Sequence, residues 1–265
     1  IVESRFTHKG DKRNLKFNIK NFKKFENKII YLIYDKIPNG IEIVLDNDNN
    51  DTKYKKYTMN ALYRENAQRN YINEGLVNAN NDDLILISDV DEIPKLSNIN
   101  FDQIKEKIIL FKQEMFYYKF NLKLPNTIWV GTKACKKKYL KNPQWLRNVK
   151  DRKYSAYRID AFFSNNKYID VKLIENGGWH FTNIKSAEEI EHKMKSYLHH
   201  REFDLNPIDL AGIEKMIKEK QAIYDLSADK RTSKIGTGKK LEKYNLEDLP
   251  EIIKLNIDKY KQWLN

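Results

Sequence analysis

The amino-acid sequence predicts an α/β protein, on the basis of its length, its composition and one short apolar segment. The chain has 265 residues, 40% hydrophobic and 32% charged, which suffices for one large α/β domain or two small ones with a polar surface. The segment Leu84–Ile87 contains four apolar residues, which suit a strand and are too few for an independent helix. Because no polar residues alternate with them, we expect a strand covered on both faces, as in a parallel sheet.

Helical and strand patterns lie on both sides of this segment. The residue pattern predicts helices over residues 15–28, 58–78, 99–109, 210–224 and 252–264. It predicts strands over residues 28–34 and 110–120, a strand end at residues 1–4, and a strand that begins at Trp129. Ser186 and Glu189 have the spacing of a capping box, which predicts the start of a further helix.

The charge and the cysteine content argue against several classes of protein. The net charge is +12, but the basic residues are mostly lysines scattered along the chain, whereas nucleic-acid-binding proteins more often concentrate Arg and Lys on one face. The single Cys135 excludes an internal disulfide framework and a multi-cysteine zinc site. No apolar run approaches the roughly 20 residues that a membrane span needs, and no signal peptide is visible. We therefore expect no nucleic-acid partner, no transmembrane segment, and a cytoplasmic protein if the chain is nearly complete.

Three carboxylates follow the predicted strand directly. Asp89, Asp91 and Glu92 lie within four residues, and Pro94 stops the segment. In open α/β sheets, ligands bind in the crevice beyond the carboxyl ends of the strands. Mg²⁺ and Mn²⁺ prefer oxygen ligands and are commonly held by one or two carboxylates together with substrate phosphates. The stretch therefore favours a divalent cation bound with a diphosphate over the alternative, an acidic turn that caps a helix.

A second dense stretch surrounds His180. Gly177 and Gly178 precede it and permit close backbone approach and unusual dihedral angles. If the segment alternates as a strand, the His180 side chain faces away from Trp179 and Phe181. A single histidine beside aromatic residues is more often a hydrogen-bonded core residue than a ligand. Its place at a strand end leaves a metal ligand or a phosphate contact as the other interpretation.

The predicted helix over residues 58–78 carries two arginines. Arg64 and Gln68 fall on one face, while Glu65 and Arg69 form an i,i+4 pair. Such a pair on an exposed surface stabilises a helix by about 0.2–0.5 kcal/mol. The alternative is that an arginine reaches the carboxylate stretch or a phosphate. The spacing alone leaves both interpretations open.

Four stretches together resemble glycosyltransferase family seventeen. They are Val-Glu-Ser-Arg-Phe-Thr-His-Lys-Gly at 2–10, Arg-Glu-Asn-Ala-Gln-Arg-Asn at 64–70, Ser-Asp-Val-Asp-Glu-Ile-Pro at 88–94 and Gly-Gly-Trp-His-Phe at 177–181. They occur in the order of the family with compatible spacing, and the likeness continues to the C-terminus. The combination is far more specific than any one of the motifs.

The resemblance implies a GT-A-like glycosyltransferase fold, in which a Rossmann-like mixed sheet is flanked by helices and followed by a helical C-terminal tail. A single catalytic domain would span residues 1–265. Its nucleotide-binding half would cover residues 1–95, its acceptor-side half 96–200 and its helical C-terminal region 201–265. The likeness also implies a further strand and helix ahead of the segment that begins at Ile1.

The activity implied by the resemblance is transfer of N-acetylglucosamine from UDP-GlcNAc to a glycan hydroxyl in β linkage. The partners would be a nucleotide-sugar donor and a glycan or glycosylated acceptor. Mn²⁺ or Mg²⁺ would be the cofactor, and it would neutralise charge on the departing nucleoside diphosphate of the UDP-sugar. A β linkage formed from an α-linked donor means inversion at the transferred sugar.

The resemblance also assigns roles to individual residues. Asp89 and Asp91 match the Asp-X-Asp motif of the family and would bind the metal, with His180 as a candidate third ligand. The remaining cofactor-binding candidates match the loop expected near the nucleoside or would support the acidic stretch and the phosphates: Glu3, Ser4, Thr7, Arg64 and Arg69.

Inversion by direct displacement needs a general base within hydrogen-bond reach of the acceptor hydroxyl. Glu92 and Glu175 are the nearest candidates in the sequence, and Glu92 matches the family pattern. We therefore name Glu92, beside Asp91, as the catalytic residue. The alternative is that Glu92 orients the metal or an arginine without contacting the substrate.

Two other classes of function compete with a transferase. A Mg²⁺-dependent enzyme that processes nucleotidyl or phosphoryl groups would use the same acidic strand end and would release nucleotide or phosphate without a sugar acceptor. A basic nucleic-acid-binding module would show steep salt-dependent binding that survives loss of Asp89 and Asp91. The four ordered motifs favour the transferase.

Overall fold

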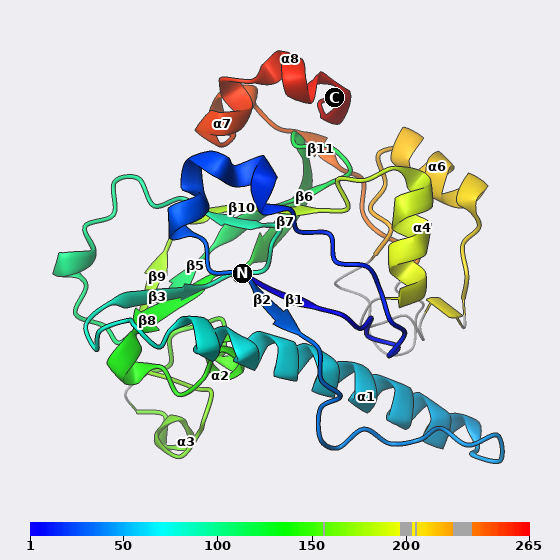
Figure 1. Ribbon diagram of the computed structural model, residues 1–265. Coiled ribbons are helices and arrows are strands. Elements are labelled where there is room, and N and C mark those ends of the chain that lie inside the picture. Colours follow the sequence, from blue (N-terminus) through cyan, green and yellow to red (C-terminus); the bar gives the residue numbers. More distant parts are fainter. Residues whose placement is uncertain (156, 197–202, 205, 225–234) are drawn as a thin grey trace. The chain divides into compact units, whose positions relative to one another are not determined.

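The computed structural model describes residues 1–155, 157–196, 203, 204, 206–224 and 235–265, with the elements shown in Figure 1. The chain forms two compact units. Unit 1 consists of Ile1–Ala79, Asn142–Gln144 and His192–Pro207, and unit 2 of Asn80–Lys141, Trp145–Glu191 and Ile208–Asn265. Residues 201, 202, 205 and 225–234 of the predicted C-terminal region lie outside the described residues.

Unit 1 contains, among its described residues, a two-stranded parallel sheet and a long helix. The elements are β1 (Val2–Ser4), the 3-10 helix η1 (Ile19–Lys28), β2 (Leu32–Tyr34), α1 (Asn50–Asn70) and the 3-10 helix η2 (Tyr71–Gly75). Helix α1 begins before the predicted residue 58, because the Asn49 side chain caps it by accepting a hydrogen bond from the Thr52 amide at 2.8 Å. The helix predicted over residues 15–28 is the shorter η1, which is kinked at Phe22.

The described part of unit 2 contains two mixed sheets, with strand orders β3-β8-β5-β9 and β11-β7-β6-β10-β4. Their strands are β3 (Leu84–Ile87), β4 (Glu92–Pro94), β5 (Ile108–Phe111), β6 (Gln113–Tyr117), β7 (Leu122–Trp129), β8 (Lys133–Lys136), β9 (Val171–Ile174), β10 (Gly178–Thr182) and β11 (Glu242–Lys243). Each sheet has one parallel pair, β5 with β9 and β10 with β6, and its other pairs are antiparallel.

Short helices complete the fold. They are the 3-10 helices η3 (Phe101–Gln103), η4 (Lys137–Tyr139), η5 (Leu246–Asp248) and η6 (Lys261–Trp263), and the α-helices α3 (Ile159–Phe162), α6 (Leu210–Lys218), α7 (Glu251–Lys254) and α8 (Ile257–Tyr260). Helices α2 (Pro143–Asn148) and α4 (Ala187–Ser196) carry residues of both units. The capping box at α4 is confirmed, because Ser186 and Glu189 exchange amide-to-side-chain hydrogen bonds of 3.1 and 3.3 Å.

The predicted fold class is confirmed: the chain has mixed sheets flanked by helices and a helical C-terminal segment. Leu84–Ile87 is a strand, β3, but the expectation of a parallel sheet is wrong. Among the residues that the structure describes, β3 is an edge strand, and it pairs with β8 in antiparallel register. Its polar-free sequence has another cause: Ile85 and Ile87 are buried, while Leu84 and Leu86 pack on the Ile109–Phe111–Ala134 cluster.

Several predicted element boundaries are also wrong. The helix predicted over residues 99–109 is replaced by η3 and the start of β5, since Ile108 and Ile109 pair with β8 and β9 on either side. The single strand predicted over residues 110–120 is divided between β5 and β6, which belong to different sheets. Trp129 ends β7 and does not begin a strand, because the next strand starts only at Lys133.

The C-terminal helices pack on the five-stranded sheet. Leu249 and Ile253 form a buried cluster with Phe116, Trp179 and Phe181 of β6 and β10, and Figure 1 shows α7 and α8 beyond the β11 end of this sheet. This packing covers the β10 side chains that point away from His180. Among the described residues, no helix is both long and apolar enough to cross a membrane.

Candidate functional site

The acidic loop, residues 88–91, links the two sheets of unit 2. It leaves β3 at the edge of the four-stranded sheet and enters β4 at the edge of the five-stranded sheet. The side chains of Asp89 and Asp91 are 39% and 32% exposed, whereas that of Glu92 has no exposed surface. The loop therefore presents two carboxylates to solvent and buries the third.

The buried Glu92 side chain anchors the acidic loop. Its Oε2 accepts a hydrogen bond from the Asp89 amide at 2.9 Å, and its Oε1 accepts one from Trp129 Nε1 at 2.7 Å. The Arg147 guanidinium donates to both oxygens at 3.1 Å. An ionised carboxylate has about four lone-pair sites, so these contacts satisfy it. This environment favours the interpretation of Glu92 as a residue that orients an arginine over the interpretation as a general base.

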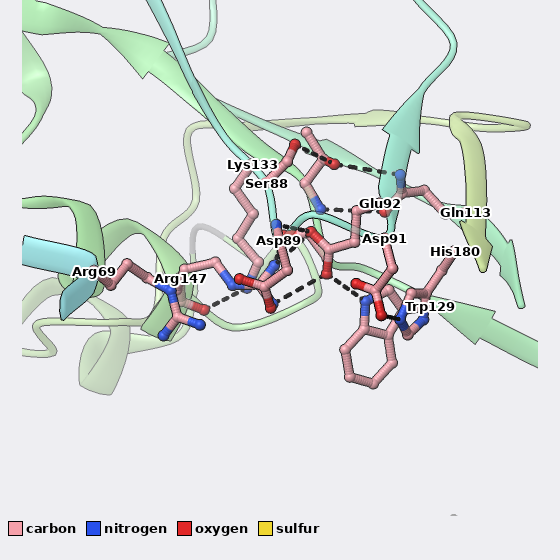
Figure 2. A network of polar contacts seen from close by, with 12 residues as sticks. Arg69, Ser88, Asp89, Asp91, Glu92, Gln113, Trp129, Lys133, Arg147 and His180 are labelled. Carbon is pink, nitrogen blue, oxygen red and sulfur yellow. Dashed lines mark hydrogen bonds and ion pairs between the residues drawn. The ribbon is translucent and has the colours of Figure 1, made fainter. Parts of the chain in front are cut away.

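Arg147, on α2, joins the buried and the exposed carboxylates. Besides its two contacts with Glu92, it donates from Nη2 to Asp89 Oδ2 at 2.8 Å and from Nη1 to the Gly131 carbonyl. Figure 2 shows Asp89, Glu92 and Arg147 pointing towards one another. A planar guanidinium suits such two-oxygen contacts better than a lysine ammonium does. Arg147 therefore holds the Asp89 side chain in one orientation.

Sequence reasoning missed Arg147, because it lies in the basic segment 147–153, whose default interpretation is a solvated loop. The local signal that could have identified Arg147 is its position on a helix that starts at Pro143. On this helix, Arg147 directly follows Leu146, which is fully buried. Its partner Glu92, however, is 55 positions away in the sequence.

Lys133 supports the segment that carries Arg147. The buried Lys133 Nζ donates to the backbone carbonyls of Arg147, at 2.9 Å, and of Val149, and it pairs with Asp151 at 2.7 Å. A cation at the C-terminus of a helix is favourable because the last carbonyls lack partners within the helix. Burial lowers the pKa of Lys133, and the nearby Asp151 only partly offsets this. Sequence reasoning missed this residue as well.

His180 lies beside Asp91 because β10 pairs with β4. His180 and Glu92 are directly opposite in this antiparallel pair, and the Phe181 amide donates to the Asp91 carbonyl at 2.8 Å. His180 Nε2 lies 3.5 Å from Asp91 Oδ2, and the imidazole stacks on the Trp129 ring with centroids 4.7 Å apart. His180 Nδ1 is buried and has no hydrogen-bond partner among the described residues.

The base of the acidic loop is fixed by a buried polar network, also drawn in Figure 2. Ser88 Oγ and Thr132 Oγ1 are 2.8 Å apart. The fully buried Gln113 exchanges hydrogen bonds with Thr132, donating to its hydroxyl at 3.3 Å and accepting from its amide at 3.2 Å. Because buried polar groups are costly when unpaired, this network specifies where β3 ends and the loop begins.

The metal-ligand set predicted from the sequence is partly assembled. Asp91 and His180 face each other, while Asp89 is paired with Arg147. In the part of the chain that the structure describes, no group of three or more His, Cys, Asp and Glu side chains is arranged to hold a metal ion. Two partly exposed carboxylates nevertheless fit a hard divalent cation that takes its other ligands from phosphate and water. The set Asp89, Asp91 and His180 stays a prediction.

The other predicted binding residues lie in unit 1, and Glu3 has a structural environment there. Its buried carboxylate accepts hydrogen bonds from the Lys16 and Phe17 amides at 2.8 and 3.0 Å and from the Tyr31 hydroxyl at 2.8 Å. Burial alone would raise the pKa of Glu3, but these hydrogen bonds and Arg13 together lower it. Glu3 therefore holds the chain after β1 against β2.

Ser4 and Thr7 stabilise turns within unit 1. Ser4 Oγ accepts a hydrogen bond from the Phe6 amide at 3.0 Å, and Thr7 Oγ1 accepts one from the Asp11 amide at 3.2 Å. Such local side-chain-to-backbone bonds are typical of Ser and Thr in turns. Their predicted role near a nucleoside is not tested by these contacts.

Arg64 and Arg69 extend from α1 of unit 1. Arg64 Nη1 donates to the His8 carbonyl at 3.0 Å, and burial lowers the pKa of Arg64. The predicted i,i+4 pair is present, since Arg69 Nη2 lies 2.8 Å from Glu65 Oε1, and Arg69 also donates to Gln144 at 2.5 Å. Both arginines thus have protein partners within unit 1, and their predicted contact with phosphates stays a prediction.

Comparison with known proteins identifies one family. A family model described as Glycosyltransferase family 17 matches residues 1–265, which is the whole chain. The comparisons with curated proteins and with solved structures gave no match.

Proposed function

The chain belongs to glycosyltransferase family 17 and is a glycosyltransferase, and we propose that it is an inverting, metal-dependent enzyme that uses a UDP-sugar. The proposed reaction moves N-acetylglucosamine from UDP-GlcNAc to a glycan hydroxyl, so that a β linkage forms from an α-linked donor. The donor and the acceptor class follow from the family resemblance, and the acidic loop supports the metal dependence.

The observation that carries the proposal is the difference in solvent exposure among the three carboxylates of unit 2. Asp89 and Asp91 reach solvent, whereas Glu92 is buried and satisfied by Trp129 and Arg147. Two exposed carboxylates two residues apart repel each other, and a cation relieves that repulsion. Burying the Glu92 carboxylate without its partners would destabilise the fold. Its presence beneath the loop, together with these partners, fits a site that must be held in one conformation.

The residues present fit a bound divalent cation held by few protein ligands. Asp89 and Asp91 would contribute one oxygen ligand each, and the donor diphosphate and water would complete the set, as is usual for Mg²⁺. His180 would be the third protein ligand through Nε2, the ring nitrogen that lies 3.5 Å from Asp91 Oδ2. When bound, the cation would act as a Lewis acid that neutralises charge on the departing diphosphate.

The protein's own contribution is preorganisation. Arg147 fixes the orientation of Asp89. The pairing of β4 with β10 fixes Asp91 beside His180. Trp129 donates a hydrogen bond to Glu92, which in turn holds Arg147. Catalytic side chains work best when their rotamers are held by packing and by hydrogen bonds from neighbouring groups. We therefore propose that Glu92 positions the site, and that its carboxylate does not itself accept the proton of the acceptor hydroxyl.

The proposal is tested by donor screening with and without Mn²⁺. With a glycan acceptor present, wild type should release UDP from UDP-GlcNAc only when a divalent cation is also present, and the sugar transferred to the acceptor should carry a β linkage by proton NMR. Asp91→Asn should abolish this release, while Asp102→Asn, a matched change at an exposed residue of η3, should not alter it. Undiminished release in EDTA, or an α-linked product, would contradict the proposed mechanism.

A further inference from the structure

The α3 loop of unit 2, residues 150–168, is described in the structure except for residue 156. Backbone hydrogen bonds hold its two ends together, from the Lys150 amide to the Asn166 carbonyl at 2.7 Å and from the Tyr154 amide to the Tyr168 carbonyl at 3.2 Å. Figure 1 shows α3 on a loop that extends beyond α2, away from the strands of the four-stranded sheet. The helical turn α3 is therefore presented from a fixed base.

Three large aromatic or aliphatic side chains of the α3 loop are turned to solvent. The exposed fractions are 93% for Tyr157, 72% for Ile159 and 86% for Phe163. Ile159 begins α3 and Phe163 caps its C-terminus, so the two residues are four positions apart and lie on the same side of the turn. Ala161, between them, is buried. The turn thus places a small residue inside and presents Ile159 and Phe163 outside, and exposed apolar groups that cluster in this way mark interaction sites.

Cationic side chains accompany these apolar ones. The α3 loop contains five cationic and two anionic residues, a net charge of +3. Arg152, Arg158 and Lys167 lie over the Tyr154 ring, at 6.0, 5.8 and 5.9 Å from its centroid. Asp160 pairs with Arg158 and with Lys167, each at 2.7 Å, and so compensates only part of this charge. A positive surface with apolar side chains at its tip results.

This combination fits the surface of an anionic bilayer. Aromatic and aliphatic side chains enter the boundary between the headgroups and the acyl chains, while Lys and Arg stay at the level of the lipid phosphates. A stable protein partner needs about 800 Å² of interface on each side, which is more than three side chains at a loop tip offer. A bilayer needs only the inserted side chains and the cations beside them.

We propose that the α3 loop is a docking site for a membrane surface that contains anionic lipids. The three exposed apolar side chains would enter the interfacial region, and the exposed Arg152 and Lys153 would contact the lipid phosphates. The protein would lie on the bilayer through this loop, and no segment needs to cross it. The inference uses neither the acidic loop nor a nucleotide, so it stands independently of the proposed function.

The test is co-sedimentation with vesicles of phosphatidylcholine alone and of phosphatidylcholine mixed with phosphatidylglycerol. Wild type should bind the mixed vesicles, and high salt should weaken this binding because it screens the charges. Ile159→Ser/Phe163→Ser should lower the partition coefficient on mixed vesicles at least about tenfold, because it removes the apolar area that the bilayer buries. The control Ile37→Ser/Ile43→Ser removes side chains of unit 1 that are 71% and 78% exposed, and it should bind as wild type does.

The cations are tested by a second pair of variants. Arg152→Gln/Lys153→Gln should also lower the partition coefficient at least about tenfold, because each Lys or Arg near an anionic membrane surface strengthens binding about fivefold. The control Lys55→Gln/Lys105→Gln removes the same charge from other exposed positions and should change the coefficient less than about twofold. Far-UV circular dichroism like that of wild type confirms that each variant folds.

Insertion is measured separately from adsorption by charge alone. An environment-sensitive fluorophore attached at Phe163→Cys in a Cys135→Ala background should brighten when mixed vesicles are added, whereas the same fluorophore at Ile43→Cys should not. Absence of binding to mixed vesicles would overturn the proposal. Binding that Ile159→Ser/Phe163→Ser leaves undiminished would also overturn it, because the loop would then bind soluble and membrane-bound anions alike through its charge.

Discussion

Arg147 and Glu92 form a buried bidentate ion pair, with Nη1 3.1 Å from Oε2 and Nη2 3.1 Å from Oε1. The same Nη2 lies 2.8 Å from Asp89 Oδ2. The buried Glu92 carboxylate therefore holds the Arg147 guanidinium. The guanidinium in turn holds the Asp89 carboxylate, which reaches solvent. This relationship links the stability of unit 2 to the geometry of the acidic loop.

Loss of Arg147 should destabilise the protein strongly. Arg147→Ala leaves the buried Glu92 carboxylate without its charged partner, and breaking a buried pair in this way costs about 3–5 kcal/mol. The free energy of unfolding from urea titrations measures the effect. Arg158→Ala is the matched control, because its pair with Asp160 is exposed and should contribute no more than about 1 kcal/mol. Equal losses in both variants would contradict a special role for Arg147.

Gly178 should tolerate no side chain. It has a φ of +130°, and an added Cβ would overlap the Ile93 carbonyl across the β4–β10 pair. Gly178→Ala should therefore destabilise the protein by at least about 1–3 kcal/mol, measured by urea unfolding. Gly75→Ala is the control, since its nearest neighbour is a Leu32 methyl group at 3.4 Å. A Gly178→Ala protein as stable as the control would show that β10 does not pair with β4 in this register.

The contribution of Glu3 should depend on pH. Its pKa is lowered in the folded protein, because the hydrogen bonds to its carboxylate and Arg13 outweigh the effect of burial. A carboxyl group whose folded pKa is lowered contributes stability that is present above its unfolded pKa, about 4.3, and is lost as the pH falls below it. Glu3→Gln should thus cost more stability at pH 7 than at pH 3, as measured by urea unfolding at both values. The exposed Glu26→Gln should show no such difference.

Cys135 should be inert in the folded protein. The thiol lies in β8 with 1% of its surface exposed, and burial raises its pKa to about 12. Because the thiolate is the reactive form, an aromatic disulfide reagent at pH 8 should modify it at least about 100-fold more slowly than in urea-denatured protein. Lys23→Cys in a Cys135→Ala background provides an exposed thiol for comparison. Rapid labelling of native Cys135 would show that β8 opens readily.

The parts of the fold that were predictable are those encoded by near neighbours in the chain. Leu84–Ile87 forms a strand because four apolar residues precede a turn, and Ser186 and Glu189 cap α4 because both partners lie within one helical turn. The antiparallel pairing of β3 at the edge of its sheet was not predictable. An edge strand whose two faces are both packed has the same uninterrupted apolar pattern as a central strand of a parallel sheet.

The candidate site was predictable only in its acidic residues. Asp89, Asp91 and Glu92 are adjacent in the sequence, and their shared charge is itself the signal. Arg147 comes from a distant helix, and only the folded chain brings it to Glu92. The burial that separates Glu92 from the two exposed aspartates is also a property of the packed sheets, and no local pattern encodes it.

The central claim, that Asp89 and Asp91 hold a cation together with a nucleoside diphosphate, is tested most directly by calorimetric titration of UDP with and without Mn²⁺. We expect a Mn²⁺-dependent component of UDP binding in wild type and in the exposed control Asp102→Ala, and its loss in Asp91→Ala. If UDP binding is the same with and without Mn²⁺, or if Asp91→Ala retains the Mn²⁺-dependent component, the assignment of the acidic loop is wrong.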